Sequence, residues 1–408
     1  MPDRSASGAW ALLRGNAGLR RLTTARIVSF AGDALSLVAL MLHVAATSGQ
    51  AIAVAALLLV GDVVPAVFAP VAGALADRFD RRRVMIGCEL VQGAALLAIA
   101  ATLPPLPLLL VLVGVRAVAG QVFQPASRAA VPALVGPRDL ETANAALGFG
   151  TNGAEALGPL LAAALLPFLG VPGVLLVDAA SFGLSALLIS RLPALPPDRA
   201  GAAPTGLLAD ARAGLGYIWS RPALRIIALG FCAVVAANGV DDVALVVLGT
   251  DDLHASDSAI ALMLAGVGVG LLAGYALLVR GARAASTTVL LVAGFAVSSL
   301  GNLLTGLAWA VAVVIALQTV RGLGVAAMDV ASNTLVQRLV PDGLLGRVFG
   351  NLYGAIGVSA AVSYIGGGLL LDAVGAPLTF VLAGAAGTVA SAAVAVTLPG
   401  RTRDPAPS

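Results

Sequence analysis

Long blocks of apolar residues, separated by short polar segments, run along the whole chain. Each block is long enough to cross a bilayer, which takes about 20 residues of α-helix. A backbone inside the hydrocarbon layer must satisfy its own hydrogen bonds, so each block is predicted to be a helix. The short alternating segments that are typical of transmembrane barrels do not occur. The pattern predicts twelve transmembrane helices, at residues 25–46, 52–75, 84–103, 107–127, 142–166, 173–192, 223–248, 258–279, 285–306, 309–332, 347–371 and 377–397.

The composition supports an all-α membrane protein. Of the 408 residues, 59% are hydrophobic and only 11% are charged, whereas about 25% of residues are charged in soluble proteins. Such a chain cannot cover its surface with polar groups, so lipid is expected to cover part of it. Residues 1–21 lack the apolar core and cleavage site of a signal peptide, so the first helix is expected to remain in the mature protein.

A segment rich in proline, alanine and charge, residues 193–222, divides the apolar blocks into two sets of six. The predicted domains are therefore an N-terminal bundle at 1–192, a linker at 193–222 and a C-terminal bundle at 223–408. Within the linker, Leu207 to Trp219 is predicted to form a short amphipathic helix on the membrane surface.

The charges predict the orientation in the membrane. Every basic residue is an arginine, and the arginines outside the spans fall almost entirely in the segments on one side, whereas the longest opposite segment carries Asp251, Asp252 and Asp257. Basic residues collect in cytoplasmic loops. We therefore expect a multi-pass protein of the cytoplasmic (inner) membrane with both termini in the cytoplasm. Arginines scattered among apolar blocks do not indicate nucleic acid binding.

The two halves of the chain repeat each other at an offset of 205 residues. Arg116-Ala-Val-Ala-Gly corresponds to Arg321-Gly-Leu-Gly, Val38-Ala-Leu to Val243-Ala-Leu, and Gly170-Val-Pro to Gly375-Ala-Pro. Three short matches at one offset indicate two related six-helix bundles. Transporters built from such repeats hold their substrate near mid-membrane where the repeats meet.

The turn after the second span is the strongest local motif. Its sequence, Gly73-Ala-Leu-Ala-Asp-Arg-Phe-Asp-Arg-Arg-Arg83, resembles the signature loop of the major facilitator superfamily, with Asp80 in place of the usual second glycine. The resemblance implies a conformational latch formed by Gly73, Asp77, Arg78, Arg81 and Arg82. In this latch Asp77 would accept hydrogen bonds from arginines or from helix N-termini. The alternative is a turn that only anchors charge in the cytosol.

Further motifs resemble the exporter branch of this superfamily. Arg116-x-x-x-Gly120 is similar to the fourth-helix motif of its proton-coupled members, and Gly158-Pro159 to the fifth-helix motif of its antiporters. Over the whole chain the closest resemblance is to bacterial drug and siderophore exporters, carried also by Arg26-Ile-Val-Ser-Phe-Ala-Gly-Asp33 and by Gln337-Arg-Leu-Val-Pro-Asp-x-x-x-Gly-Arg347. It implies the major facilitator fold, with twelve helices in two pseudo-symmetric bundles, and a functional monomer.

Several charged side chains lie inside the predicted spans. An arginine at mid-membrane costs at least about 2.5 kcal/mol, so Arg116 and Arg321 are expected to have a carboxylate partner or an aqueous cavity. A carboxyl group that alternates between an apolar and a paired environment can bind and release a proton. Acidic residues within the spans include Asp33, Asp62, Glu155, Asp178, Asp241, Asp242 and Asp329.

Among these acids, Asp33 and Glu155 are the first candidates for proton coupling, because the superfamily's cavity is lined by the first and fifth helices. Asp329 and Asp62 come next. Asn238 is expected in the cavity with the two arginines. For each carboxyl group a purely structural role is the alternative.

The sequence argues against enzymes and cofactor-binding proteins. A chain without lysine cannot contain a Gly-x-x-x-x-Gly-Lys-Ser/Thr nucleotide loop, and two histidines leave little room for a zinc site. The predicted function is proton-coupled efflux of a hydrophobic or amphipathic small molecule, with no cofactor and no metal. A solute importer or uniporter of the same fold is one alternative, and a membrane receptor that does not transport is another.

Overall fold

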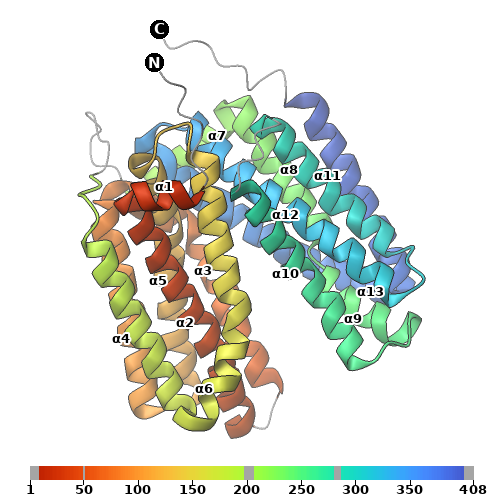
Figure 1. The fold of residues 1–408 in the computed structure, drawn as a ribbon, viewed down its shortest axis with the longest axis horizontal. Helices are drawn as coiled ribbons and strands as arrows, with labels where there is room; N and C mark the ends of the chain where they lie inside the picture. Colours follow the sequence, from red (N-terminus) through yellow and green to blue (C-terminus); the bar gives the residue numbers. More distant parts are fainter. Residues whose placement is uncertain (1–8, 49–50, 197–205, 280–285, 399–408) are drawn as a thin grey trace. The chain divides into compact units, whose positions relative to one another are not determined.

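The computed structural model describes residues 9–48, 51–196, 206–279 and 286–398 (Figure 1). These residues are almost entirely helical and contain no β-strand. The α-helices are α1 (Ala9–Gly15), α2 (Ala17–Ser48), α3 (Ala51–Arg78), α4 (Arg81–Thr102), α5 (Leu106–Leu134), α6 (Leu140–Ser190), α7 (Leu207–Ser220), α8 (Pro222–Asn238), α9 (Asp241–Val247), α10 (Asp257–Val279), α11 (Thr287–Thr305), α12 (Val311–Leu339) and α13 (Leu345–Thr397). Two short helices of other kinds are the π-helix η1 (Leu248–Asp252) and the 3-10 helix η2 (Asp342–Leu344).

The predicted linker helix at Leu207–Trp219 is present as α7. The chain divides into two compact units, which we describe separately. Unit 1 consists of Met1–Leu215 and Val340–Gly354, and unit 2 of Gly216–Leu339 and Ala355–Ser408. The domain limits at 192 and 223 stay predictions.

Unit 1 contains a polar layer between two apolar cores. In this unit α2 packs along α6, and α4 packs against α5 and α6. One core includes Leu22, Met85 and Phe123, and the other includes Leu40, Leu96 and Phe182. Three charged residues lie between residues of these two cores, one each on α2, α4 and α5; they are Asp33, Glu89 and Arg116.

Unit 2 repeats this arrangement. Here α10 and α11 pack against α12. One apolar core gathers around Phe231 and Phe295, whose rings meet edge to face, and another around Leu245 and Met263. Between them on α12 lies Arg321. Each unit therefore places an arginine between two apolar cores, Arg116 in unit 1 and Arg321 in unit 2.

Nine helices of the described residues are long and apolar enough to cross a membrane. In the most apolar window of each, only 28–50% of the residues are buried. Large apolar side chains on these helices are exposed, among them Leu97, Leu187 and Val389, and a lipid environment would remove them from water. The predicted number of twelve spans stays a prediction, although two of the nine candidates lie on α6 and α13, which each contain a break.

The breaks in α6 and α13 are at Gly170 and Gly375. Their backbone angles are φ 62°, ψ −178° and φ 77°, ψ 171°, a region that only glycine adopts readily. Each glycine lies between two predicted spans, and each is followed two residues later by a proline, Pro172 or Pro377. Proline fits the first turn of the next helix, where its missing N–H is not needed. The repeat at an offset of 205 residues thus coincides with two equivalent turns.

We predict that Gly170→Ala and Gly375→Ala each lower the stability of the purified protein, because alanine at this backbone conformation costs about 1–3 kcal/mol. The measurement is the thermal unfolding temperature in detergent. Gly183→Ala on α6 and Gly366→Ala on α13 are matched controls, since both glycines are exposed and an added Cβ would meet no atom within 4 Å. The controls are expected to be neutral or slightly stabilising. Equal unfolding temperatures for both pairs would show that the two breaks are not specified by glycine.

Candidate functional site

An ion pair between α2 and α5 forms the centre of the polar layer in unit 1. The Nη2 atom of Arg116 lies 2.5 Å from the Oδ1 atom of Asp33. The side chain of Arg116 is 14% exposed and that of Asp33 is 32% exposed. Arg116 thus has the carboxylate partner that was expected for an arginine within a transmembrane span. One side of the pair is exposed.

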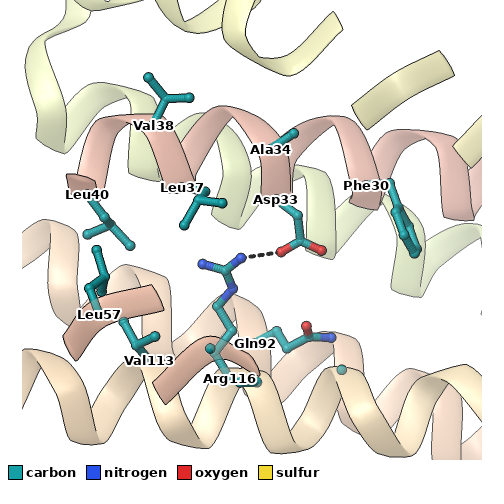
Figure 2. Close-up of a pocket in the computed structure, with 13 residues that line it drawn as sticks. Phe30, Asp33, Ala34, Leu37, Val38, Leu40, Leu57, Gln92, Val113 and Arg116 are labelled. Atoms are coloured by element: carbon teal, nitrogen blue, oxygen red, sulfur yellow. Dashed lines mark hydrogen bonds and ion pairs between the residues drawn. The ribbon is translucent and has the colours of Figure 1, made fainter. Parts of the chain in front are cut away.

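The open side of this pair faces a cavity of about 450 Å³ inside unit 1. Figure 2 shows Arg116 reaching from α5 toward Asp33 on α2, with Gln92 of α4 beside it. Apolar side chains gather at one end of the cavity, and an aromatic ring stands at the other; they are Leu37, Leu40, Leu57 and Val113, and Phe30. A cavity of this size, with mostly apolar walls and a few polar groups, is typical of small-molecule sites.

Unit 2 contains a second buried ion pair, between α9 and α12. Arg321 pairs with the Oδ2 atom of Asp241, and their side chains are 9% and 8% exposed. Arg321 corresponds to Arg116 by the offset of 205 residues, but the residue that corresponds to Asp33 is Asn238. The carboxylate in unit 2 therefore comes from a position about one helical turn further along the chain.

Asn238 takes part in an amide network rather than in an ion pair. Its Nδ2 atom donates to the hydroxyl group of Ser299 at 3.3 Å, and its Oδ1 atom accepts from Asn302 at 2.9 Å. Asp329, another of the predicted sites, accepts hydrogen bonds from the Tyr275 hydroxyl and the Asn333 amide, both at 2.9 Å. All of these side chains are bonded within unit 2. The cavity role of Asn238 and the proton-coupling role of Asp329 stay predictions.

The Asp77 carboxylate at the end of α3 binds the start of α13, within unit 1. The backbone N–H groups of Gly346 and Arg347 each donate to it at 2.7 Å. The side chains of Arg81 and Arg347 lie 3.8 and 3.9 Å from it. The free N–H groups of a helix N-terminus carry partial positive charge, which suits a carboxylate. Burial raises the pKa of Asp77 to about 6, while these N–H groups and arginines act to lower it.

Three glycines allow this close approach. An added Cβ at Gly73 would lie 2.8 Å from the Cα atom of Gly350 and 3.0 Å from the carbonyl carbon of Gly346. Without side chains at these positions the α3 and α13 backbones pack directly together, which brings Asp77 within reach of the N–H groups.

Two arginines of the predicted latch, Arg81 and Arg82, donate to backbone carbonyl groups. Arg81 donates to Ala129 at 3.0 Å and also to the Asp342 carbonyl. Arg82 donates to the Leu192 carbonyl at 2.7 Å, and Arg78 is half-buried in the last turn of α3.

Asp80, which stands where the superfamily loop has glycine, caps α4. One carboxylate oxygen accepts the N–H of Arg83 and the other accepts the N–H of Leu195, both at 3.0 Å. The departure from the motif thus adds an N-cap and a tie to the chain that follows α6.

The linker helix α7 also reaches the start of α13 within unit 1. Arg347 pairs with Asp210 of α7 at 3.2 Å, and Asn351 donates to the Ala211 carbonyl at 3.0 Å. Gly214 leaves room for this contact, because a Cβ there would lie 2.7 Å from the Cβ of Arg347. Asp77 and Asp210 therefore share one arginine, a link that the sequence analysis did not foresee.

Four predicted residues have side chains outside the described part of the structure. They are Asp62 on α3 and Glu155, Gly158 and Pro159 on α6. Their roles stay predictions.

Glu89 is the acid that the sequence analysis passed over. It lies in α4 and is fully buried. Asp178 on α6, which was noted but not ranked, is also fully buried and is an electrostatic neighbour of Arg116. Both acids could have been noticed from the sequence, because Glu89 and Asp178 are each the single carboxyl group of a largely apolar span.

Comparison with known protein families shows which family this chain belongs to. A sequence profile described as Major Facilitator Superfamily matches residues 22–275 and 239–408. The chain belongs to the Major Facilitator Superfamily. It is therefore a multi-pass membrane transporter and not an enzyme.

Relatives within the superfamily agree with this assignment. The chain is 27% identical to an uncharacterized MFS-type transporter of Bacillus subtilis, YfiS, over 91% of both chains. A stretch of 117 residues is 33% identical to macrolide efflux protein A of Streptococcus pyogenes, and it covers 26% of this chain and 29% of that protein.

Solved structures of superfamily members share the fold. An outward-facing bacterial homologue of the iron transporter ferroportin has a TM-score of 0.77 at 18% identity and covers 94% of this chain and 99% of its own. The human organic anion transporter MFSD10 has a TM-score of 0.76 at 17% identity and covers 92% and 99%. The fucose:proton symporter FucP of E. coli has a TM-score of 0.73 at 15% identity and covers 92% and 98%. At these identities the likeness shows the fold alone.

The Arg321–Asp241 pair generates a prediction about stability. Arg321→Gln and Asp241→Asn each leave one buried charge without its partner, which costs about 3–5 kcal/mol. The double variant leaves no unpaired charge, so its loss is expected to be smaller than the sum of the two single losses.

The measurement is the thermal unfolding of the four proteins in detergent, with Arg212→Gln, which removes an exposed arginine of α7, as a control expected to be neutral. Additive losses in the double variant would show that the two charges do not depend on each other.

Proposed function

We propose that this transporter exports a hydrophobic or amphipathic small molecule from the cytoplasm in exchange for protons. The observation that carries the proposal is the Asp33–Arg116 pair on the wall of a largely apolar cavity. The apolar walls suit a hydrophobic substrate, and the pair supplies a carboxylate that water can reach. The short match to a macrolide efflux protein supports export.

The proton step follows from the chemistry of the pair. When Asp33 is ionised, its charge is balanced by Arg116 at 2.5 Å. When Asp33 binds a proton, the attraction is lost and Arg116 is free to turn to a second carboxyl group, of which Asp178 is the nearest candidate by its electrostatic interaction. Proton binding at Asp33 would therefore change the charges on the wall of the cavity that holds the substrate, and this would couple the two binding events.

The proposal includes the setting of the protein. We place it in the cytoplasmic membrane with both termini in the cytoplasm, because arginines mark the cytoplasmic segments. It would act as a monomer through alternating access. Asp77 and its partners would form the latch that holds one conformation on the cytoplasmic side.

The first test requires a substrate. A thermal-shift screen of amphipathic drugs against purified protein, with a macrolide in the panel, selects the compound that is then labelled. Proteoliposomes with an imposed pH gradient are expected to move this compound uphill, and liposomes without the gradient only downhill. Downhill movement alone under both conditions would show a uniporter, and no movement of any binding compound would favour a receptor.

The second prediction concerns Asp33. Asp33→Asn fixes the neutral state, so uphill movement is expected to be lost while the compound still binds and equilibrates downhill. Glu155→Gln and the double variant are measured beside it, because Glu155 is the other first candidate. Asp252→Asn, an isosteric change at an exposed residue, is the control. Uphill pumping at the normal rate by the double variant would rule out both residues as the proton carrier.

The third prediction concerns the latch. Asp77→Asn removes the charge and one acceptor at the N-terminus of α13, and a hydrogen bond to a charged group is worth about 1.5–3 kcal/mol. We therefore expect transport to fall about tenfold or more while the amount of protein in the membrane is unchanged, with Asp252→Asn again as the control. A normal rate in Asp77→Asn would mean that the turn is only an anchor.

A further inference from the structure

The polar layer of unit 1 contains a buried acid that has no counter-ion of its own. Glu89 on α4 is 0% exposed. Neither of its carboxylate oxygens accepts a hydrogen bond of ordinary geometry from the described residues, although the hydroxyl groups of Ser29 and Ser185 are close enough to interact with it. Native proteins rarely leave both oxygens of a buried carboxylate in this condition.

The neighbours of Glu89 make a charged state still more costly. Asp33 on α2 and Asp178 on α6 both interact with it electrostatically as like charges. The cation of this cluster, Arg116 on α5, is already paired with Asp33. Among the described side chains of this cluster, three carboxyl groups thus share one guanidinium.

One glycine allows the close approach of α2 and α6, which carry two of these three acids, Asp33 and Asp178. Gly32, next to Asp33 in sequence, faces Asp178, and an added Cβ at Gly32 would lie 3.0 Å from the carboxyl carbon of that residue. Asp178 accepts a hydrogen bond from Ser181 at 3.0 Å, and the hydroxyl group of Ser36 on α2 also interacts with it. Asp178 therefore lies directly at the contact between α2 and α6.

A charge count decides which species is present. With all three carboxyl groups ionised, the cluster would hold a net charge of two minus in an apolar surrounding. Burying each unpaired ion costs several kcal/mol, whereas a protonated carboxyl group is neutral and can donate a hydrogen bond. Binding of one proton would lower the net charge of the cluster from two minus to one minus.

We propose that Glu89 is a proton-binding site, which holds a proton at neutral pH in the conformation seen here, behind the Asp33–Arg116 pair. Gln92 lies one helical turn away on the same face of α4 and lines the cavity, so the carboxyl group is one turn from space that water can enter. The use of this proton in export rests on the proposed function, but its presence does not.

The sequence makes a direct test possible, because the chain contains only three glutamates: Glu89, Glu141 and Glu155. Full-length protein is labelled with ¹³C at the glutamate carboxyl carbon and purified in detergent. Carboxyl ¹³C resonances and the shifted carbonyl stretch of protonated acids are then recorded from pH 5 to pH 8 without any substrate. We expect a protonated glutamate signal that persists at pH 7.

Substitutions then assign this signal. It is expected to be lost in Glu89→Gln, which reproduces the shape of the neutral acid, and to be retained in Glu141→Gln and Glu155→Gln. If Glu89→Gln does not yield folded protein, the other two variants still assign the signal by elimination. Three glutamates that are all ionised at pH 7, or protonated signals that Glu89→Gln leaves unchanged, would overturn the proposal. A lack of proton-driven export would overturn the proposed function and leave these spectra unchanged, so the two failures are distinguishable.

Discussion

A guanidinium group inside a bundle of apolar helices needs a carboxylate beside it, and much of this structure follows from that constraint. Arg116 and Arg321 occupy equivalent positions in the two repeats, and each is paired, with Asp33 and with Asp241. Leaving either charge alone would cost more than one hydrogen bond can offset. Each unit therefore places polar residues at the middle of its helices and apolar cores on both sides of them.

The two ion pairs differ in their exposure to water. In unit 2 both partners are about nine-tenths buried, and the amide network of Asn238 lies on the same polar layer. In unit 1 the pair opens onto a cavity, and Asp33 is one-third exposed. A charge that water can reach can exchange its proton, and a sealed pair cannot do so without a larger movement. Two related bundles can thus share one architecture while a single one of them handles protons.

Charged groups at the end of α3 also interact with several partners each. Asp77 uses the unpaired N–H groups at the start of α13, and Arg347 is shared between Asp77 and Asp210 of the linker helix. Each of these groups has more than one partner, so a movement of α13 would break several interactions together. An arrangement of this kind favours two discrete positions over a continuum.

Much of the architecture was predictable from the sequence, because helices in lipid follow from the length and hydropathy of each segment alone. The linker helix and the spans on either side of Gly170 and Gly375 could be found in this way, and the family could be found from its motifs. The partner of each charge could not. Arg321 pairs with Asp241 and not with the residue that corresponds to Asp33, and Glu89 gained its importance only when Asp33 and Asp178 were seen beside it. Hydropathy depends on local composition, whereas an ion pair depends on the rotation and spacing of helices to within a few ångströms, which only the packing of the whole bundle determines.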